Sequence, residues 1–265
     1  MEKYREIEKS IIKKYRKEIW SKFVKAIKEY KLINENDKIA VCISGGKDSF
    51  LLAKCLQELQ RHGIFKFDLK FIIMNPGYTE DVLKQIKNNL STLNINAHIF
   101  DAPIFSYTGT LENPCYLCAK MRRGYLYNYA QSLGCNKIAL GHHFNDVIET
   151  ILLNLIYSGA YASMMPKLRS TNYENMELIR PLYLVKEDDI KSWAKYNDLT
   201  FIGCACSVTK KSTGQRKKVK ELVNLLKGYN KDADKCIFTS STNVNLNTII
   251  GYKKDKEKHS FLDEY

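Results

Sequence analysis

Apolar residues recur every three or four positions through the first thirty residues of the chain, with lysine and arginine between them. The apolar positions are Tyr4, Ile7, Ile11, Tyr15, Ile19, Phe23, Ile27 and Tyr30. This spacing predicts one long amphipathic helix over residues 4–30, because side chains three and four apart share a helix face. We expect its apolar face to pack on the core. Its basic outer face is then solvated or, alternatively, contacts RNA.

Further along the chain, short apolar and β-branched runs alternate with helical patterns. Strands are predicted at residues 38–43, 68–74, 97–100, 137–140 and 178–182, and helices at 50–59, 79–93, 116–133, 146–157, 186–196 and 215–226. This alternation predicts βαβ units and a parallel sheet, whose ligands bind at the carboxyl ends of the strands. The segments 44–49, 75–78 and 141–146 follow three of the strands, so we expect them to meet at that sheet edge.

The pattern divides the chain into three parts. Residues 1–37 hold the basic amphipathic helix, residues 38–210 the α/β domain, and residues 211–265 a C-terminal helix and polar tail. From Lys253 onward the chain is dominated by charged residues and is predicted to be a solvated tail.

The formal charge of +13 predicts a polyanionic partner, because Lys and Arg neutralise phosphates and release counterions. No apolar run approaches the ~20 residues that cross a bilayer, and no secretory signal is visible. We therefore expect a cytoplasmic protein without a membrane partner. In that reducing compartment, the eight cysteines favour metal binding or thiol chemistry over disulfides.

The sequence SGGKDS at residues 44–49 lies between a predicted strand and a predicted helix. Its two glycines let the backbone approach an anion, and successive N–H groups at the helix start supply positive potential. A Walker A loop would need glycine at position 41 and serine or threonine directly after the lysine, whereas Val41 and Asp48 stand there. The loop is therefore predicted to bind phosphate in a different class of enzyme from kinases and GTPases.

Two cysteine pairs lie far apart in the sequence. Cys115 and Cys118 form a C-x-x-C at the start of a predicted helix, and Cys204 and Cys206 form a C-x-C. Such thiolates hold either a tetrahedral zinc ion or an iron–sulfur cluster, and spacing does not separate the two. Three ligands on a cluster would leave one iron open to exogenous sulfur.

These motifs together resemble the TtcA family of tRNA 2-thiocytidine synthetases, within the PP-loop ATP pyrophosphatase superfamily. The match rests on SGGKDS at 44–49, PCYLCAKMRRGYLY at 114–127, ALGHHFNDVIET at 139–150, IRPL at 179–182 followed by Cys204, MPKL at 165–168 and NVN at 243–245. The chain departs from the family in carrying Phe144 and Asn145 within GHHRDD, and C-x-C in place of the second C-x-x-C. Counting forward from IRPL, the resemblance places the family's third cluster ligand on Cys204 and leaves Cys206 as a rival.

The resemblance implies an α/β fold: a parallel-sheet PP-loop domain of the adenine nucleotide alpha hydrolase type, Rossmann-like, with an N-terminal helix and a C-terminal helical extension. It implies ATP-dependent thiolation of a tRNA base through an adenylated intermediate, with ATP, Mg²⁺ and a [4Fe-4S] cluster as cofactors. The implied partners are tRNA and a sulfur donor, either sulfide or the persulfide of a cysteine desulfurase. The oligomeric state is left open, with a homodimer among the options.

The resemblance also implies roles for individual residues. For ATP these are Ser44, Gly45, Gly46, Lys47, Asp48, Ser49, Asn75, Gly141 and His142. The implied cluster ligands are Cys115, Cys118 and Cys204, with Cys206 as a rival third ligand or a persulfide carrier. The implied catalytic residues are Asp48, Asp146 and Cys206. The implied tRNA contacts are Arg122, Arg123, Lys210, Lys211, Arg216 and Lys217.

Three alternatives are weighed against this function. The same chemistry could act on a small molecule or at another RNA position. A zinc-stapled RNA-binding module would have no catalysis, and its loop would hold only an anion. Lysidine-type amine addition needs no cluster, and the paired cysteines argue against it.

Overall fold

A computed structural model describes residues 2–63, 65–102, 104, 114–203, 214–255 and 257–263, with the side chains of residues 114–119 excepted. Its helices are α1 (Lys3–Ile12), the π-helix η1 (Arg16–Trp20), α2 (Ser21–Glu29), α3 (Lys47–His62), α4 (Glu80–Thr92), α6 (Pro114–Ser132), α7 (Phe144–Ser158), α8 (Glu187–Tyr196), α10 (Gly214–Tyr229) and α11 (Ala233–Ser240). Its strands are β1 (Lys38–Cys42), β2 (Asp68–Asn75), β3 (Ala97–Asp101), β4 (Lys137–Ala139), β5 (Lys167–Arg169), β6 (Glu177–Ile179), β7 (Gly251–Lys254) and β8 (Glu257–Ser260).

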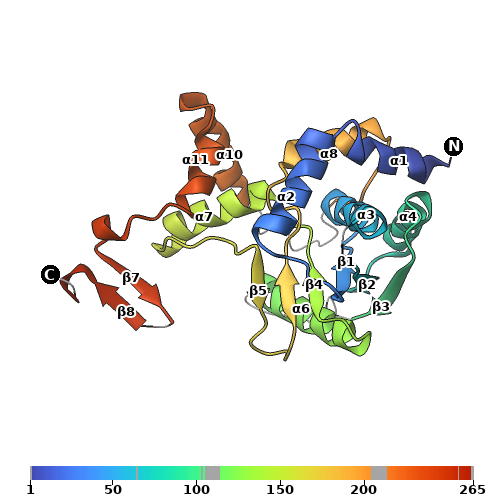
Figure 1. The fold of residues 1–265 in the computed structure, drawn as a ribbon, viewed down its shortest axis with the longest axis horizontal. Helices are drawn as coiled ribbons and strands as arrows, with labels where there is room; N and C mark the ends of the chain where they lie inside the picture. The colour runs from blue at the N-terminus through green and yellow to red at the C-terminus, as the bar shows by residue number, and fades with distance from the viewer. Residues whose placement is uncertain are drawn as a thin grey trace.

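The central sheet has the strand order β3-β2-β1-β4-β6-β5 (Figure 1). All its pairings are parallel except that of β5 with β6. The predicted α/β class with a mostly parallel sheet is therefore confirmed. The strand order reverses between β1 and β4, and a crevice at such a switch point is where open α/β sheets bind ligands.

The two faces of β1 are covered by different helices, which follows from the alternation of side chains along a strand. Ile39 and Val41 belong to a hydrophobic cluster with the side chains of α1, α2, α3 and α8. Ala40 and Cys42 belong to a second cluster with Tyr127 and Ala130 of α6. The phosphate-loop helix α3 and the cysteine-bearing helix α6 thus lie on opposite faces of one strand, and both can reach its carboxyl end.

The single helix predicted over residues 4–30 packs on the core as expected, but its predicted continuity is wrong. The chain forms α1, a turn, the π-helix Arg16–Trp20 and then α2. Tyr15 N–H donates to Ser10 O at 2.9 Å and Trp20 N–H to Tyr15 O at 3.2 Å, which are five-residue steps. The apolar spacing explains the break. From residue 7 to residue 27 every step is four residues, and on a regular helix each such step drifts by about 40°. The wider turn brings Ile19 and Phe23 back to the core, where both are fully buried.

The C-terminal part is more structured than its polar composition predicts. Helix α11 follows α10, and both pack on α7 around Phe144, Ile148 and Leu152. The predicted tail from Lys253 instead lies in the antiparallel hairpin β7–β8, although nearly all of its residues are exposed. Strand β5 was also missed, because three residues give no periodic signal. The domain boundaries at residues 37 and 210 remain a prediction.

Within the residues described, no helix combines the length and apolar character required to cross a membrane.

Candidate nucleotide-binding site

The SGGKDS loop joins the end of β1 to the first turn of α3. Gly45 takes a φ of +87°, a conformation that L side chains rarely adopt, and a Cβ there would lie 2.4 Å from Ile202 Cδ1. Ser49 Oγ donates to Gly46 O at 2.9 Å and accepts from Ser44 N–H at 3.1 Å, which closes the loop on itself. The sixteen-residue helix α3 begins at Lys47, so its first N–H groups face the loop. This arrangement is an anion cradle of the kind found at helix N-termini.

The predicted meeting of the strand ends is observed for all three segments, the third of which reaches the site through Tyr78. Gly141, two residues after β4, lies so close to the start of α3 that a Cβ there would be 3.0 Å from Asp48 C and Ser49 N. A cavity of about 320 Å³ opens at this contact and is lined by Ser44, Asp48 and Ser49 of the loop, by Gly141, His142 and Asp146, and by Arg122 and Leu126 of α6. Side chains from both faces of the sheet therefore line one cavity.

Asn75, in the third segment, is engaged elsewhere. Its side-chain Oδ1 accepts from Tyr78 N–H at 2.8 Å and Gly77 N–H at 3.1 Å, and its Nδ2 donates to Asp101 at 2.7 Å. The neighbouring Met74 and Tyr78 line the cavity in its place. Asn75 thus shapes the turn after β2, and its predicted role in binding ATP remains a prediction.

His143 connects the two candidate carboxylates. Its Nε2 lies 3.7 Å from Asp48 Oδ1, and its Nδ1 lies 3.3 Å from Asp146 Oδ2. Asp146 also accepts the backbone N–H of His143 at 2.9 Å, which caps α7. Arg216 of α10 approaches the other oxygen of Asp146, with Nη1 at 3.7 Å from Oδ1. Asp48 and Asp146, which are far apart in the sequence, therefore flank one imidazole.

Glu187 forms ion pairs with three lysines, an arrangement that the sequence does not predict. Its carboxylate lies 3.3 Å from Lys47 Nζ, 3.0 Å from Lys191 Nζ and 2.5 Å from Lys220 Nζ. Burial alone would raise the pKa of Glu187, but hydrogen bonds from Lys220 and Lys191 lower it to about 2. Lys47 also lies 3.1 Å from Asp48, so the loop lysine is held between two acids. An acid in the first turn of a helix is common, so this role cannot be predicted from the sequence.

His142 and Arg180 carry buried nitrogen atoms that could meet a ligand. His142 Nδ1 and Arg180 Nε make no hydrogen bond among the residues described. Burial, partly opposed by the charge of Asp146, lowers the pKa of His142 to about 4, so its imidazole is neutral near pH 7. Burial also lowers the pKa of Arg180, whose Nη1 donates to the carbonyl of Met165. Buried polar groups are normally satisfied, and His142 lines the cavity, so its Nδ1 suits a polar ligand there.

The predicted cysteine site lies partly outside the residues described. Cys115 and Cys118 occupy the first turns of α6, while Cys204 and Cys206 lie within the undescribed residues 204–213. The described chain on either side of that segment contacts the site. Ile202 lies against Gly45, and Arg216 lies beside Asp146.

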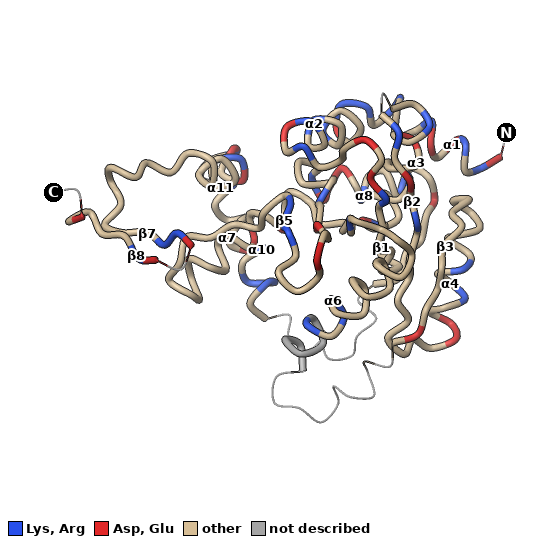
Figure 2. The backbone as a smooth tube through the Cα atoms, turned by 60° about the horizontal axis from the view of Figure 1, so that its bottom comes forward, with Lys and Arg blue, Asp and Glu red and all other residues tan. Residues whose placement is uncertain are grey.

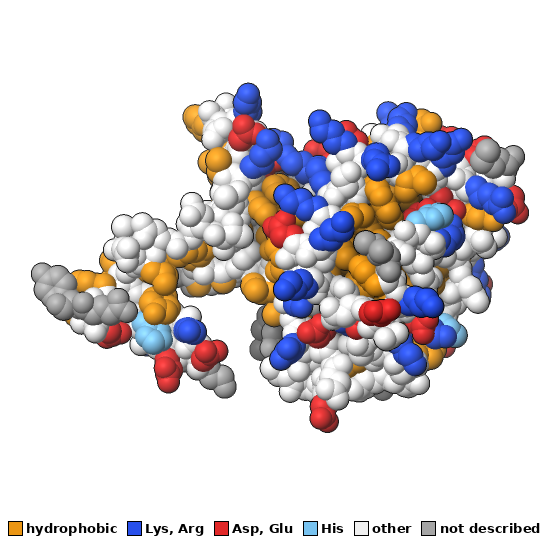
Figure 3. Space-filling model, in the orientation of Figure 1, with side chains coloured by type: hydrophobic (Ala, Val, Ile, Leu, Met, Phe, Trp, Pro, Cys, Tyr) orange, Lys and Arg blue, Asp and Glu red, His pale blue; other side chains and the backbone are white. Residues whose placement is uncertain are grey.

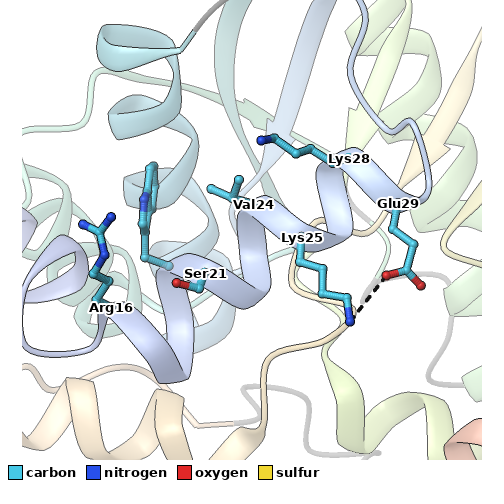
Figure 4. A pocket seen from close by; sticks show the side chains of 7 residues that line it. Arg16, Ser21, Val24, Lys25, Lys28 and Glu29 are labelled. Atoms are coloured by element: carbon cyan, nitrogen blue, oxygen red, sulfur yellow. Dashed lines mark ion pairs between the residues drawn. The ribbon is translucent and has the colours of Figure 1, made fainter.

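The residues predicted to contact tRNA fall into three groups by their location. Arg122 lines the cavity, whereas Arg123, Arg216 and Lys217 are exposed, and Lys210 and Lys211 lie outside the residues described. A separate hollow on the outer face of the N-terminal helices is lined by Arg16, Trp20, Ser21, Val24, Lys25, Lys28 and Glu29 (Figure 4). Arg16, Lys25 and Lys28 in this hollow belong to the basic face of the N-terminal helices. For that face, solvation and RNA contact are the two alternatives.

The two departures from the GHHRDD motif have structural explanations. Phe144 is buried and stacks on Phe238 of α11, with ring centroids 4.8 Å apart. Asn145 Oδ1 accepts the backbone N–H of Glu187 at 2.9 Å, a bond that an aspartate could make equally well. Both residues support the packing of neighbouring helices, and neither lines the cavity.

Comparisons with known proteins agree with this geometry. The PP-loop domain family matches residues 15–213. The chain is 34% identical to the tRNA-cytidine(32) 2-sulfurtransferase of Shewanella woodyi over 258 residues, covering 95% of this chain and 78% of the relative. It is 35% identical to the protein of the same name from Geobacter metallireducens, covering 88% of this chain and 91% of the relative. Among solved structures, the U34-tRNA thiolase NcsA of Methanococcus maripaludis superposes with a TM-score of 0.66 at 22% identity, covering 88% of this chain and 80% of that one, which supports the fold.

Proposed function

The chain belongs to the PP-loop domain family and, within it, to the tRNA-cytidine(32) 2-sulfurtransferases, and we propose that it uses ATP to replace the C2 oxygen of a tRNA cytidine with sulfur. The names of the relatives make cytidine 32 the proposed target. The net charge of +13 suits a tRNA substrate.

The observation that carries this proposal is the cavity shared by the phosphate loop and helix α6. Arg122 and Leu126 of α6 line it together with Ser44 and Asp48. Residues three, four and seven apart share a helix face, so positions 115 and 118 lie on the face of α6 that carries Arg122. The chain leading to Cys204 passes Gly45 through Ile202. ATP phosphates and cysteine ligands would therefore meet at one place.

The proposed reaction has two balanced steps. The C2 oxygen of cytidine attacks the α-phosphorus of ATP, so an O–P bond forms and pyrophosphate leaves. A hydrosulfide-level sulfur then attacks C2, the C2–O bond breaks, and AMP departs with that oxygen. Adenylation is needed because a carbonyl oxygen is otherwise a poor leaving group.

Within this reaction, the loop N–H groups and Lys47 would bind the phosphates and stabilise the charge that develops on pyrophosphate. Neutral His142 would accept or donate a hydrogen bond in the crevice, since its Nδ1 makes no hydrogen bond among the residues described. His143 would keep Asp146 at the crevice through its backbone N–H, which donates to Asp146 Oδ2 at 2.9 Å, while its ring lies between Asp146 and Asp48.

Cys115, Cys118 and Cys204 would hold the [4Fe-4S] cluster, with Cys206 as the rival third ligand or a persulfide carrier. A set of thiolates fits such a cluster. When bound by three cysteines, the cluster would offer one iron position for sulfide.

Mg²⁺ would be bound mainly through the ATP phosphates, with Asp48 or Asp146 beside it. No group of three His, Cys, Asp or Glu side chains that could hold a metal ion occurs in the described part of the chain. Magnesium commonly uses one or two carboxylates together with substrate phosphates, so this donor set suits it.

The test is mass spectrometry of tRNA nucleosides from cells with and without the gene. We expect 2-thiocytidine to disappear on deletion, to return with the wild-type gene and to stay absent with Asp48→Asn. Restoration by Asp188→Asn, a change to an exposed acid outside the cavity, provides the matched control. Unchanged thionucleosides after deletion would exclude the proposed substrate.

The cysteine assignment is tested by iron content after anaerobic purification. We expect Cys115→Ala, Cys118→Ala and Cys204→Ala to lose most iron. Cys236→Ala, an exposed free cysteine on α11, should keep it. If Cys206→Ala loses iron while Cys204→Ala keeps it, Cys206 is the third ligand.

A further inference from the structure

The N-terminal helices α1, η1 and α2 carry a large share of the positive charge of the chain. Residues 2–31 contain eleven Lys or Arg against five Glu, which gives +6 of the total of +13. Of these eleven cations only Lys22 is half-buried, and the other ten are exposed. Figure 3 shows Lys and Arg side chains gathered over this part of the molecule, and Figure 2 shows the same cations recurring along α1 and α2.

Most of these cations are not neutralised within the chain. Lys22 pairs with Asp189 at 3.0 Å, while the pairs of Arg5 with Glu2 and of Lys25 with Glu29 join exposed side chains. Eight others make no ion pair with any residue that the structure describes: Lys3, Lys9, Lys13, Lys14, Arg16, Lys17, Lys28 and Lys31. A polyanion would relieve the repulsion among them and release counterions of its own.

Part of this charge surrounds a concave surface. The basic hollow on η1 and α2, with a volume of about 620 Å³, is lined by Arg16, Trp20, Ser21, Val24, Lys25, Lys28 and Glu29. Figure 4 shows Arg16 at one end of it and Lys25 and Lys28 toward the other. The Trp20 ring stacks on Phe23 with centroids 5.6 Å apart, which fixes an aromatic ring beside the cations. Cations interleaved with aromatic rings are typical of surfaces that bind RNA.

The burial of the apolar face argues against a membrane as the partner. A basic amphipathic helix binds a lipid surface by inserting its apolar face between the headgroups. In this chain Ile19, Phe23 and Ile27 of that face are at most 3% exposed, because they pack on the core. Only the cations and the hollow between them are left for a partner. The phosphates of a nucleic acid need no more than this.

The basic hollow is linked to the nucleotide-binding site through the first turn of α8. Lys22, which follows Ser21 of the hollow, donates to Asp189 at 3.0 Å. Two residues earlier in the same turn, Glu187 lies 3.3 Å from Lys47 of the phosphate loop and 2.5 Å from Lys220 of α10. Cations therefore continue from the site to the hollow across one helical turn. An RNA with its target base in the site would extend over the hollow.

We propose that the basic hollow binds phosphates of the tRNA substrate that lie outside the stem-loop carrying the target base. Arg16, Lys25 and Lys28 neutralise these phosphates, and Trp20 supplies a ring against which sugar or base can pack. The hollow is thus an anchoring surface for tRNA, separate from the cavity in which the chemistry takes place. This inference rests on the proposed function for the identity of its RNA.

The first test is the binding of full-length tRNA by the full chain without ATP, measured by fluorescence anisotropy over a series of salt concentrations. The triple variant Arg16→Gln, Lys25→Gln, Lys28→Gln should bind about tenfold more weakly at about 0.1 M salt. The slope of the logarithm of affinity against the logarithm of salt concentration should fall by about 3, because each duplex phosphate contact contributes about 0.9.

The matched control is a second triple variant, Lys70→Gln, Lys84→Gln, Lys87→Gln. It removes the same charge from exposed positions on β2 and α4, at the β3 end of the sheet. The carbonyl of Lys31, just after α2, instead accepts from Lys167 of β5 at the other end. The control should bind tRNA as wild type does. Equal affinities and equal salt slopes for the two triple variants would overturn the proposal.

A second measurement separates the hollow from the catalytic cavity. A stem-loop fragment carrying cytidine 32 should bind wild type and the hollow variant alike, because it lacks the remote phosphates. A tenfold loss with this fragment as well would place the hollow at the target stem-loop and contradict the proposal. Vesicles of anionic lipid give the other contrary outcome, in which the hollow variant loses lipid binding and keeps full tRNA affinity. Absent thiolation with a hollow-dependent affinity for tRNA would remove the proposed function alone.

Discussion

The strand-end site and the C-terminal arm, residues 241–255 and 257–263 with the hairpin β7–β8, differ in how far their side chains find partners within the chain. At the site, charged groups find partners within the chain: Glu187 gathers three lysines, and His143 lies between two carboxylates. On the arm, apolar side chains such as Ile250 find none among the described residues. A region whose charged groups are paired within the chain should respond to substitution through folding stability and chemistry. A region whose apolar side chains are exposed should respond with little change in folding stability.

The largest effect on stability is expected at Lys54, which anchors α3 beneath the phosphate loop. Lys54 is fully buried, and its Nζ donates to Glu8 at 2.5 Å and to the carbonyl of Leu93 at 2.8 Å. Lys54→Met leaves Glu8 with Arg61 alone and should lower the free energy of unfolding by about 3 kcal/mol in urea denaturation. The control is Lys25→Met, an exposed lysine 3.7 Å from Glu29, with an expected change below about 0.5 kcal/mol. Equal stability of both variants would contradict the anchoring role.

The next effect concerns Glu187, which lies 3.3 Å from Lys47. We expect Glu187→Gln to slow ATP-to-AMP turnover by about tenfold, or 1.4 kcal/mol of barrier, because Lys47 loses one of its two acidic partners. Asp188→Asn is the matched control, since it removes the same charge from the same helix turn, and the Asp188 side chain is 80% exposed. Equal rates for the two variants would show that Glu187 does not contribute to ATP-to-AMP turnover.

The pH dependence of stability should depend on His142. Burial, partly opposed by Asp146, lowers the pKa of His142 in the folded chain to about 4, from an ordinary 6.5. Between these values the unfolded chain binds the extra proton, so stability falls as pH falls from 6.5 toward 4 and is unaffected by this group above 6.5. Near pH 5, wild type should have lost stability on the order of 1 kcal/mol through this group, and His142→Gln should not show that loss. Urea denaturation at several pH values measures the difference. Parallel pH profiles for variant and wild type would show that His142 does not titrate in this way.

The smallest effect is expected on the arm. Ile250→Asp should change the free energy of unfolding, measured by urea denaturation, by less than about 0.5 kcal/mol, because the side chain is 81% exposed. A large loss of monomer stability would mean that the arm packs on its own chain.

The sequence predicted the parts of the fold that depend on local periodicity. Buried β-branched runs such as residues 38–43 gave the strands, and parallel pairing brought SGGKDS and Gly141 together. The cluster of lysines around Glu187 could not be predicted, because these lysines come from α3, α8 and α10 and meet only through tertiary packing. The hairpin was missed because its charged residues resemble a solvated segment. The π-turn did leave a signal, in apolar steps of four residues that are too long for a regular helix.

That π-turn also affects how the N-terminal segment tolerates changes in length. A π-turn holds about one residue more than an α-turn, so removing one residue from Arg16–Trp20 would leave a regular helix with α1 and α2 still in phase. A deletion within α2 would instead rotate Ile27 by about 100° away from the core. In an alignment of relatives, single-residue gaps in this segment should therefore fall at residues 13–20 and be absent from residues 21–29.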